Sequence, residues 1–191
     1  MASRASSGAL RSTAVDPKDR LPAHWPEFDP REMLRRLTQA GVDFVVIGAI
    51  AVILSGYGRA TRDLDIAFGT DAGNLEALAE VLVGLNASLR GVHDQVRFVP
   101  DARTLSGIQL LTLDTSKGWL DIHRSVPGMR SYEALRRRAE RVKLADVSVL
   151  VASVDDLIAM KRAAGRAQDL IDIGALEAIK RLREPDGHQE S

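Results

Sequence analysis

Acidic and apolar side chains alternate at the end of the stretch Arg59-Ala60-Thr61-Arg62-Asp63-Leu64-Asp65-Ile66. This alternation predicts a β-strand, because successive side chains of a strand point to opposite faces of a sheet. One face would present Asp63 and Asp65, while Leu64 and Ile66 would enter the core. Two neighbouring carboxylates repel each other unless a cation lies between them. The stretch therefore predicts a half-buried strand that carries a cation-binding pair of acids.

A glycine turn precedes this pair and a third acid follows it. The short continuous apolar run 44–47 is typical of a buried strand, and Gly48 and Ala49 follow it directly. Glycine permits a tight turn, and the N–H groups at the start of a helix can bind a phosphate. Asp121 lies in the apolar segment 119–122 and would complete an oxygen cage for Mg²⁺. Together these residues suit phosphoryl or nucleotidyl transfer.

The rest of the chain predicts one α/β (α+β) domain, with a mixed β-sheet flanked by helices and two helices at its C-terminal end. The domain would span residues 29–183, between flexible tails at 1–28 and 184–191. Helices are expected at 30–40, 49–54, 71–85, 132–138, 157–164 and 170–182, and strands at 44–47, 64–68, 96–99, 108–113, 119–122 and 147–151.

Composition excludes several classes of protein. The chain has 191 residues, 26 of them basic and 26 acidic, and no cysteine. A balanced charge argues against bulk coating of nucleic acid, and the lack of cysteine excludes disulfides, zinc–thiolate sites and thiol nucleophiles. No apolar run approaches the roughly 18 residues of a membrane span. We therefore expect a cytoplasmic protein without a membrane partner.

The motifs also resemble a known fold. The segment 47–49, followed after thirteen residues by Asp63-Leu64-Asp65-Ile66, resembles the nucleotidyltransferase fold shared with DNA polymerase beta. The stretch 59–65 more narrowly resembles the AbiEii-type branch, found among toxins of bacterial toxin–antitoxin pairs and their uncharacterised relatives. Residues 156–161 and 166–172 are similar to the C-terminal motif of that branch. The resemblance covers roughly residues 30–182.

The resemblance implies a transfer of a nucleoside monophosphate from an NTP to a hydroxyl acceptor, assisted by Mg²⁺ or Mn²⁺. Asp63, Asp65 and Asp121 would hold the metal, and Asp121 could instead act as the general base. Lys161 would contact phosphate as a point charge. The acceptor would be an RNA, a protein or a small molecule, and a toxin would also have a cognate antitoxin. The expected nucleotide-binding residues are Gly48, Ala49, Arg59, Thr61, Arg62 and Asp169.

Some residues leave alternatives open. Ala49 stands where the family usually has Gly or Ser, so a catalytically weak nucleotide-binding or regulatory domain is the second hypothesis. A third is a structural module in which the acids do not converge. Lys161 could lie on a solvated helix face, and Asp169 and Asp172 could pair with Lys161 or Arg166. A basic segment could hold RNA, although such runs are usually solvated helix faces; it comprises Arg136, Arg137, Arg138, Arg141 and Lys143.

Overall fold

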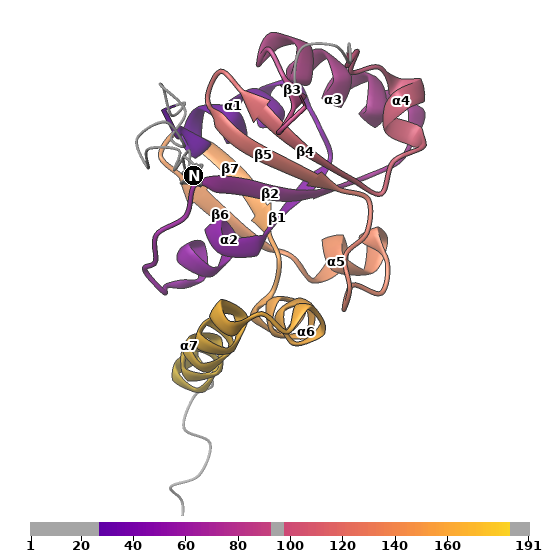
Figure 1. Ribbon diagram of the computed structural model, residues 1–191. Helices are drawn as coiled ribbons and strands as arrows, with labels where there is room; N and C mark the ends of the chain where they lie inside the picture. Colours follow the sequence, from indigo (N-terminus) through magenta and orange to yellow (C-terminus); the bar gives the residue numbers. More distant parts are fainter. Residues whose placement is uncertain (1–26, 93–97, 184–191) are drawn as a thin grey trace, which may run out of the picture.

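The computed structural model describes residues 27–92 and 98–183, and within these ranges the chain forms one mixed sheet covered by helices on both faces (Figure 1). The strand order is β3-β4-β5-β2-β1-β7-β6. The strands are β1 (Phe44–Ile47), β2 (Asp63–Phe68), β3 (Ser88–Leu89), β4 (Leu110–Thr115), β5 (Gly118–His123), β6 (Glu140–Leu144) and β7 (Val147–Val151). The helices are α1 (Pro30–Gln39), α2 (Gly48–Ser55), α3 (Ala72–Gly84), α4 (Ala102–Ser106), α5 (Tyr132–Arg138), α6 (Val154–Ala164) and α7 (Ala167–Arg183). The predicted α/β architecture is confirmed.

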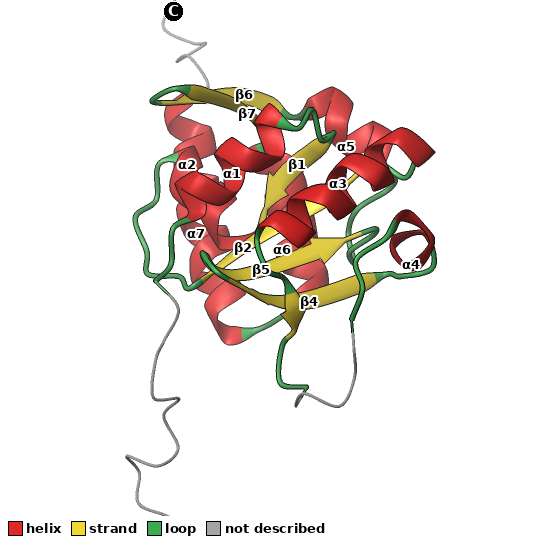
Figure 2. Cartoon of the chain, turned by 90° about the horizontal axis from the view of Figure 1, so that it is seen from above, coloured by secondary structure: helices red, strands yellow, loops and turns green. Residues whose placement is uncertain are grey.

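Strand β2 lies in the middle of the sheet, antiparallel to β1 and parallel to β5. Its apolar side chains, Leu64, Ile66 and Phe68, are completely buried. They face the layer formed by α1 and α3, which Figure 2 shows in front of the sheet. The predicted alternation is therefore correct, since the two aspartates of β2 point to the opposite face.

The opposite face is covered by α2 and by the C-terminal helices α6 and α7, which pack against each other (Figure 1). Helix α6 begins at Val154, three residues before the expected range, because the hydroxyl of Ser153 caps it by accepting a hydrogen bond from the backbone N–H of Asp156. It ends at Gly165, which has a positive φ of 66°. Helix α7 starts three residues earlier than expected, where the backbone N–H of Arg166 donates to the carboxylate of Asp169.

Several segments differ from the sequence prediction. The expected tails fall mainly on residues 1–26 and 184–191, which lie outside the described ranges. The strand expected at 96–99 falls partly on residues 93–97, which are also outside them, and Phe98 and Val99 adopt no regular structure. Strands β3 and β6 and helix α4 were not predicted. They are short or, in β6, mostly charged, so they carry little hydrophobic periodicity. No described helix is long and apolar enough to cross a membrane.

Candidate active site

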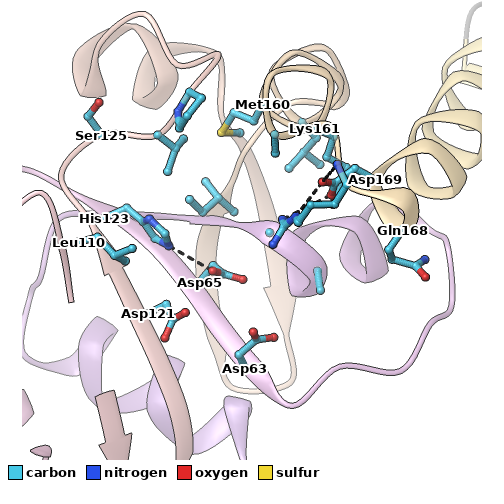
Figure 3. Close-up of a pocket in the computed structure, with 18 of the residues that line it drawn as sticks. Asp63, Asp65, Leu110, Asp121, His123, Ser125, Met160, Lys161, Gln168 and Asp169 are labelled. Atoms are coloured by element: carbon cyan, nitrogen blue, oxygen red, sulfur yellow. Dashed lines mark hydrogen bonds and ion pairs between the residues drawn. The ribbon is translucent and has the colours of Figure 1, made fainter. Parts of the chain in front are cut away.

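Three aspartates leave the same face of the sheet at its centre. In the parallel register of β2 and β5, Asp65 is the direct partner of Asp121, and Asp63 precedes Asp65 by two positions. All three line a cleft of about 610 Å³ between the sheet and α6 (Figure 3). The hypothesis of a structural module with dispersed acids is therefore wrong.

Neighbouring side chains hold the two carboxylates of β2. The hydroxyl of Thr61 donates to Oδ1 of Asp63 over 2.6 Å. Nε2 of His123 lies 3.2 Å from Oδ1 of Asp65, and the dashed line in Figure 3 marks this contact. Thr61 thus contacts an acid of the site and is not among the residues that line the cleft. His123 also lines the cleft, two positions after Asp121 on the same strand face.

The third carboxylate, Asp121, is paired with Arg90, which the sequence analysis did not single out. The Arg90 guanidinium also lies over the Trp119 ring, 4.8 Å from its centroid. Burial raises the pKa of Asp121 above its ordinary value, the charge on Arg90 opposes this rise, and the negative charges of Asp65 and Asp63 add to it. Arg90 therefore offsets part of the cost of burying the Asp121 charge.

Gly48 is required where β1 turns into α2. Its φ is +64°, and a Cβ added there would lie 2.1 Å from Oδ2, 2.6 Å from Cγ and 2.8 Å from Cβ of Asp65. Only glycine lets the Asp65 carboxylate lie against this turn. No side chain caps the start of α2, where the buried Ala49 follows Gly48. The turn therefore brings an acid and a helix N-terminus together.

A group of five charged residues, here named the ionic cluster, lies at one side of the cleft, and four of them line it. Lys161 of α6 is at its centre, with Nζ 3.1 Å from Oδ1 of Asp169 and 2.7 Å from Oδ2 of Asp172. Lys161 is only 6% exposed and Asp172 is completely buried, so the alternative of a solvated helix face for Lys161 is wrong. The other two members are Arg59 and Arg166.

The two arginines of the ionic cluster lie at the cleft. Nη1 of Arg59 is 2.6 Å from Oδ2 of Asp172, and Nε of Arg166 is 2.8 Å from Oδ2 of Asp169. Both arginines line the cleft. The aspartates of α7 therefore orient two cations toward the same space that the acids of the sheet face, and the expected pairing of these aspartates with Lys161 and Arg166 is confirmed.

The comparison with known families agrees with this geometry. The family described as nucleotidyltransferase of unknown function (DUF6036) matches residues 31–185, which is most of the chain. The chain belongs to this nucleotidyltransferase family. Membership identifies the chain as a transferase of phosphorus-containing groups. The narrower AbiEii-type assignment has no such support. No curated protein matches the chain in sequence.

Solved structures share the fold of this nucleotidyltransferase. The lincosamide antibiotic adenylyltransferase LnuA, solved with lincomycin bound, is similar with a TM-score of 0.55 and 18% identity, over 80% of this chain and 99% of its own. ANT(2")-Ia, solved with adenylyl-2"-tobramycin, is similar with a TM-score of 0.50 and 13% identity, over 81% of this chain and 92% of its own. At these identities the likeness concerns the fold.

The remaining predicted positions of the nucleotidyltransferase are not among the residues that line the cleft. Arg62 is exposed and is not among the residues that line the cleft. The basic segment is divided between α5 and β6, and two of its arginines are paired: Arg136 with Asp43 and Arg138 with Asp156. None of its five residues is among those that line the cleft.

Replacing Gly48 by alanine tests the contact with Asp65. An alanine at positive φ costs about 1 to 2 kcal/mol in itself, and Gly41→Ala measures that cost alone, since Gly41 has φ +70° and nothing within 4 Å of an added Cβ. We expect Gly48→Ala to lower the free energy of unfolding more than Gly41→Ala, and to abolish nucleotide binding. Chemical denaturation of both variants measures the difference, and equal losses would contradict the steric role of Gly48.

The ionic cluster also predicts how stability depends on pH. Burial alone would raise the pKa of Asp172, but hydrogen bonds from Lys161 and Gln168 and the charges of Lys161 and Arg59 hold it below its ordinary value of 3.8. The pKa of Asp169 is lowered as well. A carboxyl whose pKa is lower in the folded state stabilises the protein at neutral pH, and this contribution disappears as the pH falls through the unfolded and then the folded pKa.

We therefore expect the wild-type free energy of unfolding to fall more steeply below about pH 4 than that of Asp172→Asn. Urea unfolding between about pH 3 and about pH 6 measures both slopes. Parallel curves would mean that the Asp172 carboxyl titrates alike in the folded and unfolded states.

Proposed function

We propose that this nucleotidyltransferase moves a nucleoside monophosphate from an NTP to a hydroxyl group of a small molecule, with Mg²⁺ or Mn²⁺ as cofactor. The observation that carries the proposal is the Asp65–Asp121 pair beneath the Gly48 turn. It combines two carboxylates and a helix N-terminus in one cleft, next to the cations of the ionic cluster. These are the groups that nucleotidyl transfer requires.

The donor set suits a divalent cation. Within residues 27–92 and 98–183, no three side chains of His, Cys, Asp or Glu converge closely enough to hold a metal by themselves. Mg²⁺, however, is usually bound through one or two carboxylates together with substrate phosphates, and not by an all-protein cage. Asp63 and Asp65 present such oxygens on one face, so they fit an ion that the triphosphate helps to coordinate. Such an ion would neutralise charge on the phosphates.

The chain's own groups would carry out the remaining steps. Backbone N–H groups of Gly48 and Ala49 at the start of α2 bind phosphate oxygens, and Arg59 and Arg166 bind others from the opposite wall. Asp121 accepts the proton of the acceptor hydroxyl as general base, because it is the direct partner of Asp65 and faces the same cleft. The acceptor oxygen then bonds to the α-phosphorus as the bond to the β-phosphate oxygen breaks, which releases pyrophosphate.

A small-molecule acceptor is favoured over RNA. Lincomycin and tobramycin are the small molecules named in the two structures of the same fold, and the basic segment that could have held RNA is partly paired and outside the cleft. An NTP-dependent enzyme would act in the cytoplasm. The toxin role implied by the AbiEii resemblance stays a prediction: overexpression should arrest growth in a transfer-dependent manner, and a cognate antitoxin should restore it.

The second candidate is a nucleotide-binding or regulatory domain with weak chemistry. Two observations favour it. Ala49 lacks the hydroxyl contact that a serine would make at this position, and Arg90 is already paired with Asp121, the proposed base. Metal-dependent NTP binding without label transfer from α-labelled NTP to any acceptor would distinguish it.

Thermal unfolding with ATP, GTP, CTP and UTP, each with and without Mg²⁺, tests the proposal. A ligand at about 100 times its dissociation constant adds about 2.7 kcal/mol, which corresponds to a rise in Tm of about 5 to 10 °C for a domain of this size. We expect such a rise with at least one nucleotide, and only with the metal present. Unchanged unfolding with all four would contradict nucleotide binding.

A further inference from the structure

The cleft has two chemically different halves; Figure 3 shows Leu110 on one side of the three aspartates and Lys161 and Asp169 on the other. One half is the ionic cluster, where Lys161 and Asp169 lie beside Gln168. The other half, here named the apolar half, belongs to β4, the loop after β5, and α6. It consists of Leu110, Val126, Pro127 and Met160.

Leu110 shows that the apolar half is open to solvent and is not simply part of the buried core. It is directly opposite His123 in the antiparallel register of β4 and β5, so its side chain leaves the same face of the sheet as Asp121. Despite this position it is 48% exposed, among the described large apolar residues that remain open to solvent. A single exposed leucine is ordinary, but this one borders the carboxylates and adjoins further apolar side chains. It therefore offers a surface for a ligand in the cleft.

The rest of the apolar half is already formed. Gly128, with φ +86°, follows Pro127, and a Cβ added to it would lie 2.5 Å from the backbone oxygen of Ala159 in α6. The loop that carries Val126 and Pro127 is thus packed directly against α6, beside Met160. A preformed apolar wall near a few polar groups is the usual construction of a small-molecule site.

The charges of the cleft argue against a polycationic acceptor. A polycation needs acids that are not engaged elsewhere, whereas Asp63 and Asp65 are assigned to the metal, Asp121 is paired with Arg90, and Asp169 is paired with Lys161 and Arg166. RNA is disfavoured too, because no Phe, Tyr or Trp occurs among the described residues that line the cleft. Single-stranded nucleic acid usually stacks its bases on such rings.

We infer that the acceptor is a neutral, hydroxyl-bearing small molecule whose apolar part lies against the apolar half while its hydroxyl approaches Asp121. This inference rests on the proposed function and specifies its substrate class. The ionic cluster then binds the phosphates of the nucleotide, and the nucleotide and the acceptor come together at the three aspartates. The apolar half supplies affinity and Asp121 supplies the orientation of the reacting oxygen.

Methyl, butyl and hexyl β-glucoside are suitable probes, because they are neutral, hydroxylated and differ only in apolar length. Their affinities are measured by calorimetry, with and without Mg²⁺ and a non-hydrolysable ATP analogue. Each fully buried methylene strengthens binding about fourfold, so we expect hexyl glucoside to bind at least roughly tenfold more tightly than methyl glucoside. Tobramycin serves as the polycationic probe and total tRNA as the nucleic acid, and both should bind more weakly than hexyl glucoside.

A matched pair of variants locates the effect. Leu110→Ser should weaken hexyl glucoside about tenfold and leave methyl glucoside unchanged, whereas Leu182→Ser should change neither, because Leu182 is 87% exposed at the end of α7 and does not line the cleft. Equal affinities along the series, equal effects of the two variants, or tighter binding of tobramycin or tRNA would overturn the inference. Chain-length-dependent binding without any Mg²⁺–nucleotide effect would instead overturn the proposed function and leave the apolar subsite standing.

Discussion

Asp65→Asn is expected to remove the metal-dependent stabilisation by nucleotide, a loss of about 5 to 10 °C in Tm at a ligand concentration near 100 times the dissociation constant. The substitution keeps the shape of the side chain and removes the charge that a divalent cation needs. Asp65 is central, because it adjoins Asp121 in the register and lies against the Gly48 turn. Label transfer from the NTP should fall by about a hundredfold to a thousandfold, the range seen when a key electrostatic group is lost.

Asp114→Asn provides the control for this loss. Asp114 is opposite Trp119 in the register of β4 and β5, so it leaves the same face of the sheet, but it does not line the cleft. The Asp114→Asn variant should keep the metal-dependent rise in Tm that the nucleotide causes. Without ligand, Asp65→Asn should unfold at the wild-type temperature or above it, since one of three mutually repelling charges is gone. A large loss of stability in the unliganded variant would instead assign Asp65 to the fold.

The sequence was sufficient to predict the strand faces of the site. Alternation of acidic and apolar side chains correctly gave Asp63 and Asp65 a common face, and the apolar flanks of Asp121 correctly placed it on a strand. The register that makes Asp65 and Asp121 direct partners was not predictable, because β2 and β5 are far apart in sequence and their pairing depends on the packed sheet. Local patterns determine faces, whereas tertiary packing determines neighbours.

The pairing of Arg90 and the burial of the ionic cluster were also not predictable from local sequence patterns. Arg90 follows a strand of only two residues, in a segment without periodicity, so nothing local connected it with Asp121. The charges of α6 and α7 could be paired by their helical spacing, but only the packing of the two helices shows that Lys161 and Asp172 are buried. Gly48 was correctly expected at a tight turn, whereas its close approach to Asp65 is visible only in the fold.

The ionic cluster connects the stability of the C-terminal helices with the site. Asp172 accepts from Lys161 over 2.7 Å, from Arg59 over 2.6 Å and from Gln168 over 3.2 Å, so three donors depend on one buried carboxylate. Arg59 precedes β2 in the chain, and its partner lies on α7. The cluster therefore fixes α7 against the segment that leads to the catalytic strand, and it presents cations to the cleft at the same time.

Asp172→Ala should lower the free energy of unfolding by about 3 to 5 kcal/mol, because it leaves the buried Lys161 with only one of its two carboxylate partners. Tm should fall by roughly 6 °C or more. Glu177→Ala is the matched control, since Glu177 is also on α7 and also pairs with a basic residue of α6. That residue, Arg162, is 63% exposed along its side chain and Glu177 is 40% exposed. Exposed pairs of this kind contribute about 0 to 1 kcal/mol.

The double variant Lys161→Met, Asp172→Leu separates stability from binding. Replacing a buried ion pair by apolar side chains of similar volume is often neutral or stabilising, so this protein should unfold near the wild-type temperature. It should nevertheless lose most of its Mg²⁺–nucleotide stabilisation, because Lys161 no longer carries a charge and Arg59 has lost the carboxylate that directs it into the cleft. Retention of the full nucleotide effect would restrict Lys161 and Asp172 to a structural role. Loss of stability without rescue would mean that the pair contributes through its hydrogen bonds, which apolar side chains cannot replace.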